Sequence, residues 1–479
     1  MRLKLPEKYI FFIVGIAAIT ALVFWLLHDP VRNFSENKPG LDNRPPIDTS
    51  KLAQVTIGEK FTFYENQTSQ LTGKWPNFRG VDFDNINKEK IPLIDSWENG
   101  KPKIVWQALM GEGHAAPAIY DGRVYILDYD ENKKADALRC FSLESGKELW
   151  KRWYKVPVKR NHGMSRTIPA VNEKYVVSIG PVGHVMCVDR ITGNFIWGID
   201  LVKEYGAEIP FWYTGQCPFI DNGVAVIAPG GKSLLIGVDC ATGQVVWKTP
   251  SPDGWKMSHS SVIPMTWGGT KMYVYAAIGG ICGVSAESGN TGQLLWQTTA
   301  FAPSVVAPSP VVFNDGKIFV TAGYGAGSAM LKLEKGGGGF SVKVLQIYKP
   351  KDGLASEQQT PVVLNGKMYA VLPKDAAAER NQFVCCDPSD CTKYLWTSGK
   401  TERFGLGPYL FANGKFFILD DDGTLTIARI SNSGFEVLDK TRIIEGQDAW
   451  GPFALADGYL LMRDSKNLVC LDVRKNPDK

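Results

Sequence analysis

A tryptophan that recurs at regular intervals constrains the fold of this chain more than any other feature. The intervals are 44 to 50 residues, and the last, of 100, equals two periods. A period of this length with several short strands per unit is typical of a β-propeller. The repeated tryptophans, and the glycines in the phrase Ser/Thr-Gly-x-x-x-Trp that four of them complete, are Trp106, Trp150, Trp197, Trp247, Trp296, Trp396, Gly146, Gly193, Gly243 and Gly292.

One repeat shows what each unit contains. Residues 360–364 form an apolar run that ends at the turn pair Asn365-Gly366, and residues 367–372 form a second run. An Asn-Gly pair between two such runs predicts a tight hairpin. Two more strands, 383–386 and 393–396, complete a four-stranded sheet, which needs neighbouring sheets to bury both of its faces.

The same unit can be traced eight times between residues 103 and 476. Proline at the first residue of a strand costs no ladder hydrogen bond. The last unit lacks a fourth strand, and residues 103–106 form a fourth strand that lacks the other three. Pairing them predicts an all-β, eight-bladed propeller with tryptophan-docking repeats, closed by its N- and C-terminal strands. Two fourth strands lack the tryptophan, at 345–348 and 435–438, and the units open at Pro117, Pro169, Pro218, Pro264, Pro310, Pro361, Pro408 and Pro452.

The N-terminus predicts one transmembrane helix. Residues 9–27 are uncharged and mostly apolar, long enough to span a bilayer, and Arg2, Lys4 and Lys8 precede them. Basic residues before the helix favour a cytoplasmic N-terminus and place the propeller on the periplasmic side of the inner membrane. We therefore expect a signal-anchor helix at 1–27, an extracytoplasmic linker at 28–74 and the propeller at 75–479. Late cleavage as a signal peptide is the alternative.

Charge and cysteine content restrict the partners and the chemistry. The net charge of +4 over 479 residues shows no basic stripe, which argues against nucleic acid. Cys140, Cys187 and Cys386 each stand ten residues before a repeat tryptophan, and Cys470 occupies the same place in the last unit. We interpret this position as a packing site for a small side chain in the third strand. Disulfides are the alternative for an exported domain.

A binding site is expected on one face of the ring. The loops that enter each first strand, and those that join second and third strands, share that face, and function in a propeller resides on such loops. Their polar and aromatic residues converge on the mouth of the central channel. The candidate ligand-binding residues there are His114, His162, Arg166, Trp212, Gln216, Lys256, His259, Gln359, Lys374, Asp375, Arg380 and Trp450.

The repeat phrases resemble a known family. The segments 187–197 and 237–247, each ending in Thr-Gly-x-x-x-Trp, resemble the tryptophan-docking repeat of the PQQ-like (quinoprotein-type) β-propellers, and Trp75-Pro-Asn-Phe-Arg-Gly80 resembles their lead-in segment. The resemblance implies eight blades. It also implies two kinds of relative: quinone-dependent alcohol dehydrogenases, and cofactor-free scaffolds similar to the propeller of the outer-membrane protein assembly machinery.

Two functions follow from these observations. The first is a membrane-anchored binding or scaffold module for a protein, peptide or saccharide, with no cofactor and no metal. The alternative is a dehydrogenase that uses PQQ with calcium, which needs oxygen ligands for calcium and a carboxylate base. The vicinal pair Cys385–Cys386 resembles the vicinal disulfide of those enzymes, but its place in the third strand puts it away from the mouth. No catalytic residue is assigned.

Overall fold

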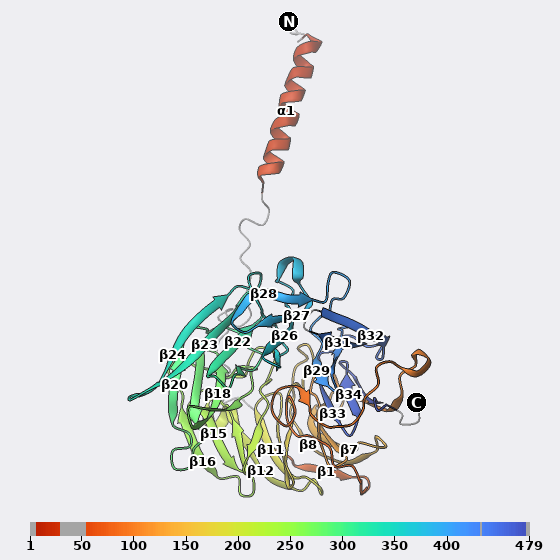
Figure 1. Ribbon diagram of the computed structural model, residues 1–479, viewed down its shortest axis with the longest axis vertical. Helices are drawn as coiled ribbons and strands as arrows, with labels where there is room; N and C mark the ends of the chain where they lie inside the picture. Colours follow the sequence, from red (N-terminus) through yellow and green to blue (C-terminus); the bar gives the residue numbers. More distant parts are fainter. Residues whose placement is uncertain (1–5, 29–53, 432–433, 476–479) are drawn as a thin grey trace. The chain divides into compact units, whose positions relative to one another are not determined.

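The computed structural model describes residues 6–28, 54–431 and 434–475. Two compact units divide the chain, residues 1–42 and residues 43–479. The first contains α1 (Glu7–Leu27), within which Tyr9–Leu27 is long and apolar enough to cross a membrane, with a mean hydropathy of 2.8. The second contains eight sheets that follow one another around a ring, as the colours in Figure 1 show. The predicted eight-bladed propeller and apolar N-terminal helix are confirmed.

Each of the first four blades is a meander of four antiparallel strands whose innermost strand comes first. Their strands are β5 (Ala118–Tyr120), β6 (Arg123–Asp130), β7 (Ala135–Ser142) and β8 (Glu148–Lys155); β9 (Ala170–Val171), β10 (Tyr175–Ile179), β11 (His184–Asp189) and β12 (Phe195–Asp200); β13 (Phe219–Asp221), β14 (Val224–Ile227), β15 (Ser233–Asp239) and β16 (Val245–Pro250); β17 (Ile263–Trp267), β18 (Thr270–Ala277), β19 (Gly280–Ser285) and β20 (Leu294–Thr298).

Blades 5 to 7 repeat this order, and blade 8 takes its outermost strand from the start of the domain. Their strands are β21 (Val311–Val312), β22 (Lys317–Ala322), β23 (Gly327–Gly336) and β24 (Gly339–Tyr348); β25 (Val362–Leu364), β26 (Lys367–Val371), β27 (Phe383–Asp387) and β28 (Asp390–Thr397); β29 (Tyr409–Ala412), β30 (Lys415–Leu419), β31 (Thr424–Ser431) and β32 (Gly434–Arg442); β33 (Gly451–Ala456), β34 (Tyr459–Arg463), β35 (Asn467–Asp472) and β4 (Ile104–Leu109). Short helical turns are α2 (Leu201–Tyr205), η2 (Glu98–Gly100) and η3 (Ala377–Glu379).

The ring closes as the repeat count predicts. Strand β4 pairs antiparallel with β35, and this pairing sets Trp106 opposite Cys470. The first and last strands of the propeller thus share one sheet, which leaves no gap between blade 8 and blade 1 and removes two exposed sheet edges.

The repeat tryptophans pack between neighbouring blades. Trp150 is fully buried, and its indole N–H donates to the Ile191 carbonyl of the next blade at 3.1 Å. Gly193 follows in the same turn with a φ of +69°, and a Cβ there would lie 2.7 Å from the Trp150 ring. Glycine therefore serves both the turn and the close approach of the indole. Gly146, Gly243 and Gly292 contact Trp106, Trp197 and Trp247 in the same way.

The strand register corrects one expectation about the cysteines. Cys140 and Cys187 pair with Trp150 and Trp197, but in blade 6 the residue opposite Trp396 is Cys385, not Cys386. The sequence count fails there because the turn between β27 and β28 changes the spacing by one residue. All nine cysteines are buried free thiols in the structure.

The segment before the ring contacts the inner strands of several blades. Strand β2 (Lys74–Trp75) pairs with β5 of blade 1, and β3 (Ile86–Asn87) pairs with β29 of blade 7. Between them Arg79 is buried and donates to the Pro361 carbonyl of blade 6 at 3.1 Å. The Trp-Pro-Asn-Phe-Arg-Gly phrase thus connects the inner strands of distant blades.

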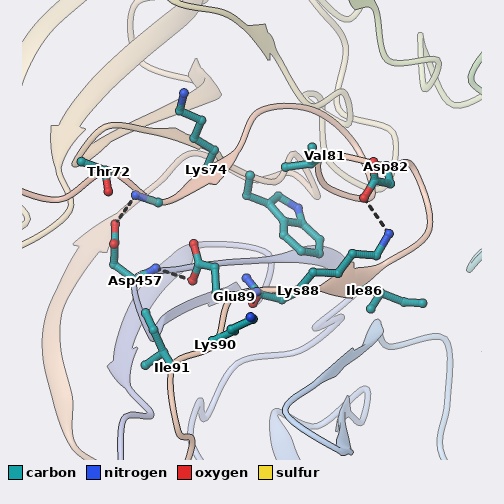
Figure 2. Close-up of a pocket in the computed structure, with 13 residues that line it drawn as sticks. Thr72, Lys74, Val81, Asp82, Ile86, Lys88, Glu89, Lys90, Ile91 and Asp457 are labelled. Atoms are coloured by element: carbon teal, nitrogen blue, oxygen red, sulfur yellow. Dashed lines mark hydrogen bonds and ion pairs between the residues drawn. The ribbon is translucent and has the colours of Figure 1, made fainter.

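A recess of about 520 Å³ lies beside this segment, around Trp75 and Asp457 (Figure 2). Asp457 accepts the Gly73 N–H at 2.8 Å, while Glu89 accepts the Asp457 N–H at 2.8 Å. Burial raises the pKa of both carboxyls, and the charge of Asp457 raises the pKa of Glu89 further. These bonds fix the segment to the β33–β34 turn of blade 8.

Part of the expected linker 28–74 is an ordered strand on the propeller. Residues 29–53 lie outside the described residues. Strand β1 (Lys60–Phe63) pairs antiparallel with the outer edge of β8, setting Phe63 opposite Trp150. One outer edge of the propeller is therefore covered by an extended segment of the same chain.

Hydrogen bonds also join the inner strands from blade to blade. The Cys217 N–H donates to Ser261 Oγ at 2.9 Å, the Ser261 N–H to Ser309 Oγ at 3.2 Å, and the Ser309 N–H to Thr360 Oγ1 at 2.9 Å. Cys217, Ser309 and Thr360 directly precede the prolines that open their blades, Ser261 stands three residues before Pro264, and all four are buried. Because each hydroxyl satisfies a buried backbone donor, this arc holds blades 3 to 6 in register.

We expect Ser309→Ala to lower the free energy of unfolding by about 1–3 kcal/mol, since it leaves the buried Ser261 N–H without an acceptor. Urea unfolding followed by tryptophan fluorescence measures the change. Ser145→Ala, which removes an exposed hydroxyl, should change stability by no more than about 0.5 kcal/mol. Equal losses in the two variants would contradict a special role for the arc.

Candidate functional site

An aromatic pair lies across the mouth of the channel. Trp212, in the loop between blades 2 and 3, stacks on Tyr324 from the β22–β23 turn of blade 5, with ring centroids 5.5 Å apart and an interplanar angle of 16°. Phe211 meets Trp212 edge to face at 4.9 Å, and His259 lies 6.1 Å from it. Blades 3 and 5 are not neighbours, so this stack spans the mouth.

Arg166 anchors the loop that carries Trp212. Its guanidinium donates to the carbonyls of Trp212 at 2.5 Å, Asn161 at 3.1 Å and His162 at 2.5 Å. Asn161 in turn donates to the Phe211 carbonyl at 2.8 Å. Burial lowers the pKa of Arg166 to about 10, so the group remains a cation at neutral pH. The position of Trp212 is thus set by backbone contacts rather than by loop sequence alone.

Two neutral imidazoles lie under these loops. His114 is buried, packs on Trp450 with ring centroids 5.0 Å apart, and places Nε2 3.2 Å from the His162 carbonyl. Burial, together with the positive charges of Arg166 and Arg463, lowers the pKa of His114 to about 3. Burial and Arg166 lower the pKa of His259 to about 3 as well. Both rings are therefore uncharged near pH 7.

Acidic residues occupy the side of the mouth formed by blades 5 to 7. Burial raises the pKa of Glu357, against the opposing effect of Lys374, and Asp375 and Asp421 raise it further. Asp375 accepts the Gly325 N–H at 2.8 Å, next to Tyr324, and the Lys374 ammonium lies 5.6 Å from the Tyr324 ring centre. The charged residues of blade 6 therefore contact the aromatic stack.

The eighth blade joins this acidic side through Trp450. Its indole N–H donates to Asp421 Oδ1 at 2.8 Å. The Gln359 amide donates to the carbonyls of Leu406 and Trp450 at 3.1 and 3.3 Å. Side-chain hydrogen bonds thus link the loops of blades 6, 7 and 8 at the mouth.

Three candidate residues have other surroundings. The Gln216 amide is fully buried and exchanges hydrogen bonds with the Ala228 backbone, so it braces blade 3. Lys256 forms an ion pair with Glu208 at 2.7 Å, with both side chains about half exposed. The Arg380 side chain is exposed beside η3. The structure brings the other nine candidates together around the mouth.

Buried polar atoms without a hydrogen-bond partner concentrate at the mouth. Native proteins leave few such atoms, and each calls for an explanation such as water, an ion or a ligand. Among the described residues there are twelve, and seven belong to the loops of this face. They are His114 Nδ1, Ser165 Oγ, Thr214 Oγ1, His259 Nε2, Ser260 Oγ, Glu357 Oε2 and Asp375 Oδ1.

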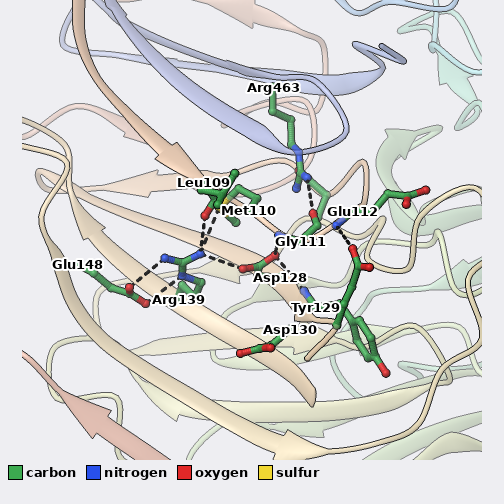
Figure 3. A network of polar contacts seen from close by, with 12 residues as sticks. Leu109, Met110, Gly111, Glu112, Asp128, Tyr129, Asp130, Arg139, Glu148 and Arg463 are labelled. Carbon is green, nitrogen blue, oxygen red and sulfur yellow. Dashed lines mark hydrogen bonds and ion pairs between the residues drawn. The ribbon is translucent and has the colours of Figure 1, made fainter. Parts of the chain in front are cut away.

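The loop that carries His114 is held by an arginine network at the junction of blades 8 and 1 (Figure 3). Arg463 is fully buried and donates to the carbonyls of Gly111, Ala115, Asp464 and Ser465 at 2.8–3.2 Å. Burial lowers its pKa to about 10. Gly111 also donates its N–H to Asp128 at 2.7 Å.

Arg139 completes the network on the blade 1 side. It makes a bidentate pair with Glu148, with both distances 2.9 Å, and a further contact of 2.8 Å to Asp128. Two carboxylates around one guanidinium fix the planar group in a single orientation. The network therefore sets the path of the chain that leads into His114.

Sequence reasoning missed Tyr324, Asp421 and Arg463. Tyr324 stands in a glycine-rich turn between a second and a third strand. Asp421 lies in an Asp-Asp-Asp-Gly turn and Arg463 at the end of an apolar strand, and neither pattern indicates a contact with the mouth. Only Tyr324, the one aromatic residue in its turn, carried a usable signal.

The two neutral histidines predict acid sensitivity. Both have a folded pKa of about 3, below the ordinary value of 6.5, so the unfolded chain binds their protons first as the pH falls. Their contribution to stability is complete above pH 6.5 and is lost between pH 6.5 and 3, by about 1.4 kcal/mol per pH unit for each ring. Urea unfolding at pH 7 and pH 5 should show His114→Gln losing less stability than the parent protein over this interval. Equal losses would contradict a buried neutral imidazole at this position.

The mouth fits calcium and a quinone poorly. The structure has no group of three or more His, Cys, Asp or Glu side chains suited to a metal ion in 6–28, 54–431 and 434–475. Asp421 already accepts hydrogen bonds from the Leu406 N–H and the Trp450 indole, and the face of Trp212 is already covered by Tyr324. Cys385 and Cys386 lie in β27 opposite Trp396 and Tyr394, away from the mouth.

Comparison with known proteins shows the family to which this chain belongs. A sequence model of the family described as outer membrane protein assembly factor BamB matches residues 133–390, more than half of the chain. The protein is thus a propeller of PQQ-like repeats, and it belongs to this BamB-type family. No curated protein sequence matches the chain.

Several solved structures share the fold at low identity. BamB from Moraxella catarrhalis aligns with a TM-score of 0.52 and 11% identity, over 78% of this chain and 100% of its own. A europium-containing methanol dehydrogenase gives 0.55 and 13%, over 83% and 89%. The quinohemoprotein alcohol dehydrogenase of Comamonas testosteroni gives 0.54 and 12%, over 84% and 81%. At such identities the likeness concerns the fold alone, which serves both assembly factors and dehydrogenases.

Proposed function

We propose that this protein is a membrane-anchored propeller that binds a protein, peptide or saccharide through the loops of its mouth, without a cofactor. The helix α1 provides the anchor, and the charges before it favour an inner membrane with the propeller on the periplasmic side. The family match to an assembly factor supports a role in binding.

The observation that carries the proposal is the group of seven buried polar atoms without partners around the Trp212–Tyr324 stack. Hydroxyls, neutral imidazoles and carboxyls offer both donors and acceptors, while the aromatic rings offer apolar faces. Such a mixed lining is typical of a ligand site and is costly to maintain for packing alone.

Site-specific photocrosslinking in membranes tests the proposal. A photoreactive residue replaces the exposed Lys374 at the mouth, and a matched one replaces the exposed Asn222, in the β13–β14 turn on the opposite face. We expect discrete adducts from position 374 that disappear when Trp212→Ala is added, and none of these adducts from position 222. The same adducts from both positions would exclude the mouth as the binding face.

Titration of the full-length protein with PQQ and calcium tests the dehydrogenase alternative. We expect no saturable binding by quinone absorbance or thermal shift up to high micromolar cofactor. Saturable, calcium-dependent binding that His259→Ala or Arg166→Ala abolishes would replace our proposal with a quinone-dependent enzyme.

A further inference from the structure

The docking position of each blade has a fixed geometry. It is the fourth-strand residue that pairs with the third strand immediately before a β-bulge, as Trp150 pairs with Cys140. An indole there packs on the turn between the third and fourth strands of the next blade. In blades 8 and 2 the indole N–H donates to a carbonyl of that turn, from Trp106 to Leu143 at 2.7 Å and from Trp197 to Cys240 at 2.9 Å.

In blade 5 the docking position holds glutamine. Gln346 pairs with Met330 immediately before the bulge, so it is the counterpart of Trp150. Its side chain is exposed and donates to the adjacent Ile347 carbonyl at 3.4 Å. A recess of about 330 Å³ lies where the indole would be, between β24 and the turn of blade 6. It is lined by Met330, Leu345, Gln346, Tyr348, Pro388 and Thr392, among others.

Blade 7 also lacks a tryptophan at its docking position, and a segment from outside the blade takes its place. Asp439 occupies the position and accepts the backbone N–H of Trp97 at 2.7 Å. The Val473 carbonyl, three residues after Cys470 as Leu143 is three after Cys140, accepts the Ile94 N–H at 2.9 Å. Trp97 itself is 5% exposed within the core of blades 7 and 8. A separate segment thus supplies both the hydrogen bond and an indole.

We propose that the vacant docking position of blade 5 receives a tryptophan, or another large aromatic side chain, from a partner protein. Large aromatic anchors in partly preformed pockets carry most of the energy of many interfaces. Met330 and Tyr348 form a buried apolar wall there. The Pro388 carbonyl, three residues after Cys385, corresponds to the Leu143 and Cys240 carbonyls that accept an indole in blades 1 and 3, and no side chain of the described ranges donates to it.

The partner segment is extended and lies along β24. This strand is the last of its sheet, and no strand of the described chain pairs with its outer edge. Ile347 is 54% exposed and Val344 37% exposed along the same strand. Blade 1 provides the precedent, because β1 adds antiparallel to the outer edge of β8. Strand addition supplies backbone hydrogen bonds, and the recess selects the side chain.

Display of two random nonapeptide libraries on phage, one with a fixed central tryptophan and one with alanine, tests this proposal on the full-length protein in detergent. We expect enrichment from the tryptophan library alone. Gln346→Trp should weaken binding of the selected peptides at least tenfold, because the protein then fills its own recess. Leu345→Ser should weaken it similarly, whereas Val246→Ser, at the same place beside the filled docking position of Trp247, should leave it unchanged.

Gln346→Trp also tests whether the recess accepts an indole independently of any peptide. We expect its midpoint of thermal unfolding to rise, as filling a cavity adds apolar contacts. A lower midpoint, equal enrichment from both libraries, no enrichment, or equal binding to the parent and Gln346→Trp would each overturn the proposal. Because the recess is on the outer rim, Trp212→Ala should not change peptide binding, which separates this result from the fate of the proposed mouth site.

Discussion

Replacing Trp150 with alanine should lower the free energy of unfolding by about 3–5 kcal/mol, the usual cost of removing a large buried aromatic side chain. The indole is fully buried between blades 1 and 2, and its hydrogen bond to Ile191 is lost with it. Gly193, which faces the indole, has no side chain that could move into the cavity left by Trp150. Its φ of +69° also excludes most larger residues at this position. The loss therefore includes both the apolar contacts and the cavity that remains.

Urea unfolding followed by circular dichroism measures this effect. Trp153→Ala provides the control on the same strand, because its ring is half-buried and lies 5.2 Å from the Lys133 ammonium at the surface. We expect the control to lose less than half as much stability. A loss below about 1 kcal/mol in Trp150→Ala would show that the repeat tryptophans do not hold the blades together.

Replacing Arg463 with methionine should cost at least about 3 kcal/mol, because removing a buried charged donor leaves its partners unsatisfied. Four carbonyls at the junction of blades 8 and 1 lose the guanidinium as a donor, and methionine offers similar length without hydrogen bonds. Gly111 and Ala115 flank His114, so the mouth loop should also lose its order. We expect faster amide exchange at residues 110–116.

The matched control is Arg429→Met. Arg429 is 51% exposed and forms ion pairs with Asp95 and Glu436 at 3.4 Å. Exposed pairs of this kind contribute little, so we expect a change of about 0–1 kcal/mol. If both variants lose the same stability and amide exchange at 110–116 stays unchanged, Arg463 is not the group that holds this loop.

Much of the fold could be predicted from residue spacing. The period of the tryptophans gives the number of blades, because one sheet of four strands needs a nearly constant length of chain. The opening prolines and the unmatched strand at 103–106 predict the closure through β4. The shared face of the candidate loops can also be predicted. Successive strands of a blade run in opposite directions, so every second connecting loop returns to the same face. These features depend on local sequence patterns, and each pattern recurs in several repeats.

The details of the site could not be predicted in the same way. Gln216 and His259 occupy comparable loops, yet one braces the Ala228 backbone and the other lies under Trp212. Tyr324 meets Trp212 from two blades away. The orientation of a loop side chain depends on which distant segments it meets, and no local pattern records that contact.

The sequence by itself determined a ring of eight blades, its closure and its apolar N-terminal helix, because these depend on repeat length, hydrophobic pattern and turn chemistry. Only the tertiary structure decided which residue of Leu345–Tyr348 occupies the docking position of blade 5, because a β-bulge shifts the register there. It also decided that 93–97 fills the gap in blade 7 while that of blade 5 stays vacant. Such contacts arise between segments far apart in the chain, where spacing carries no information.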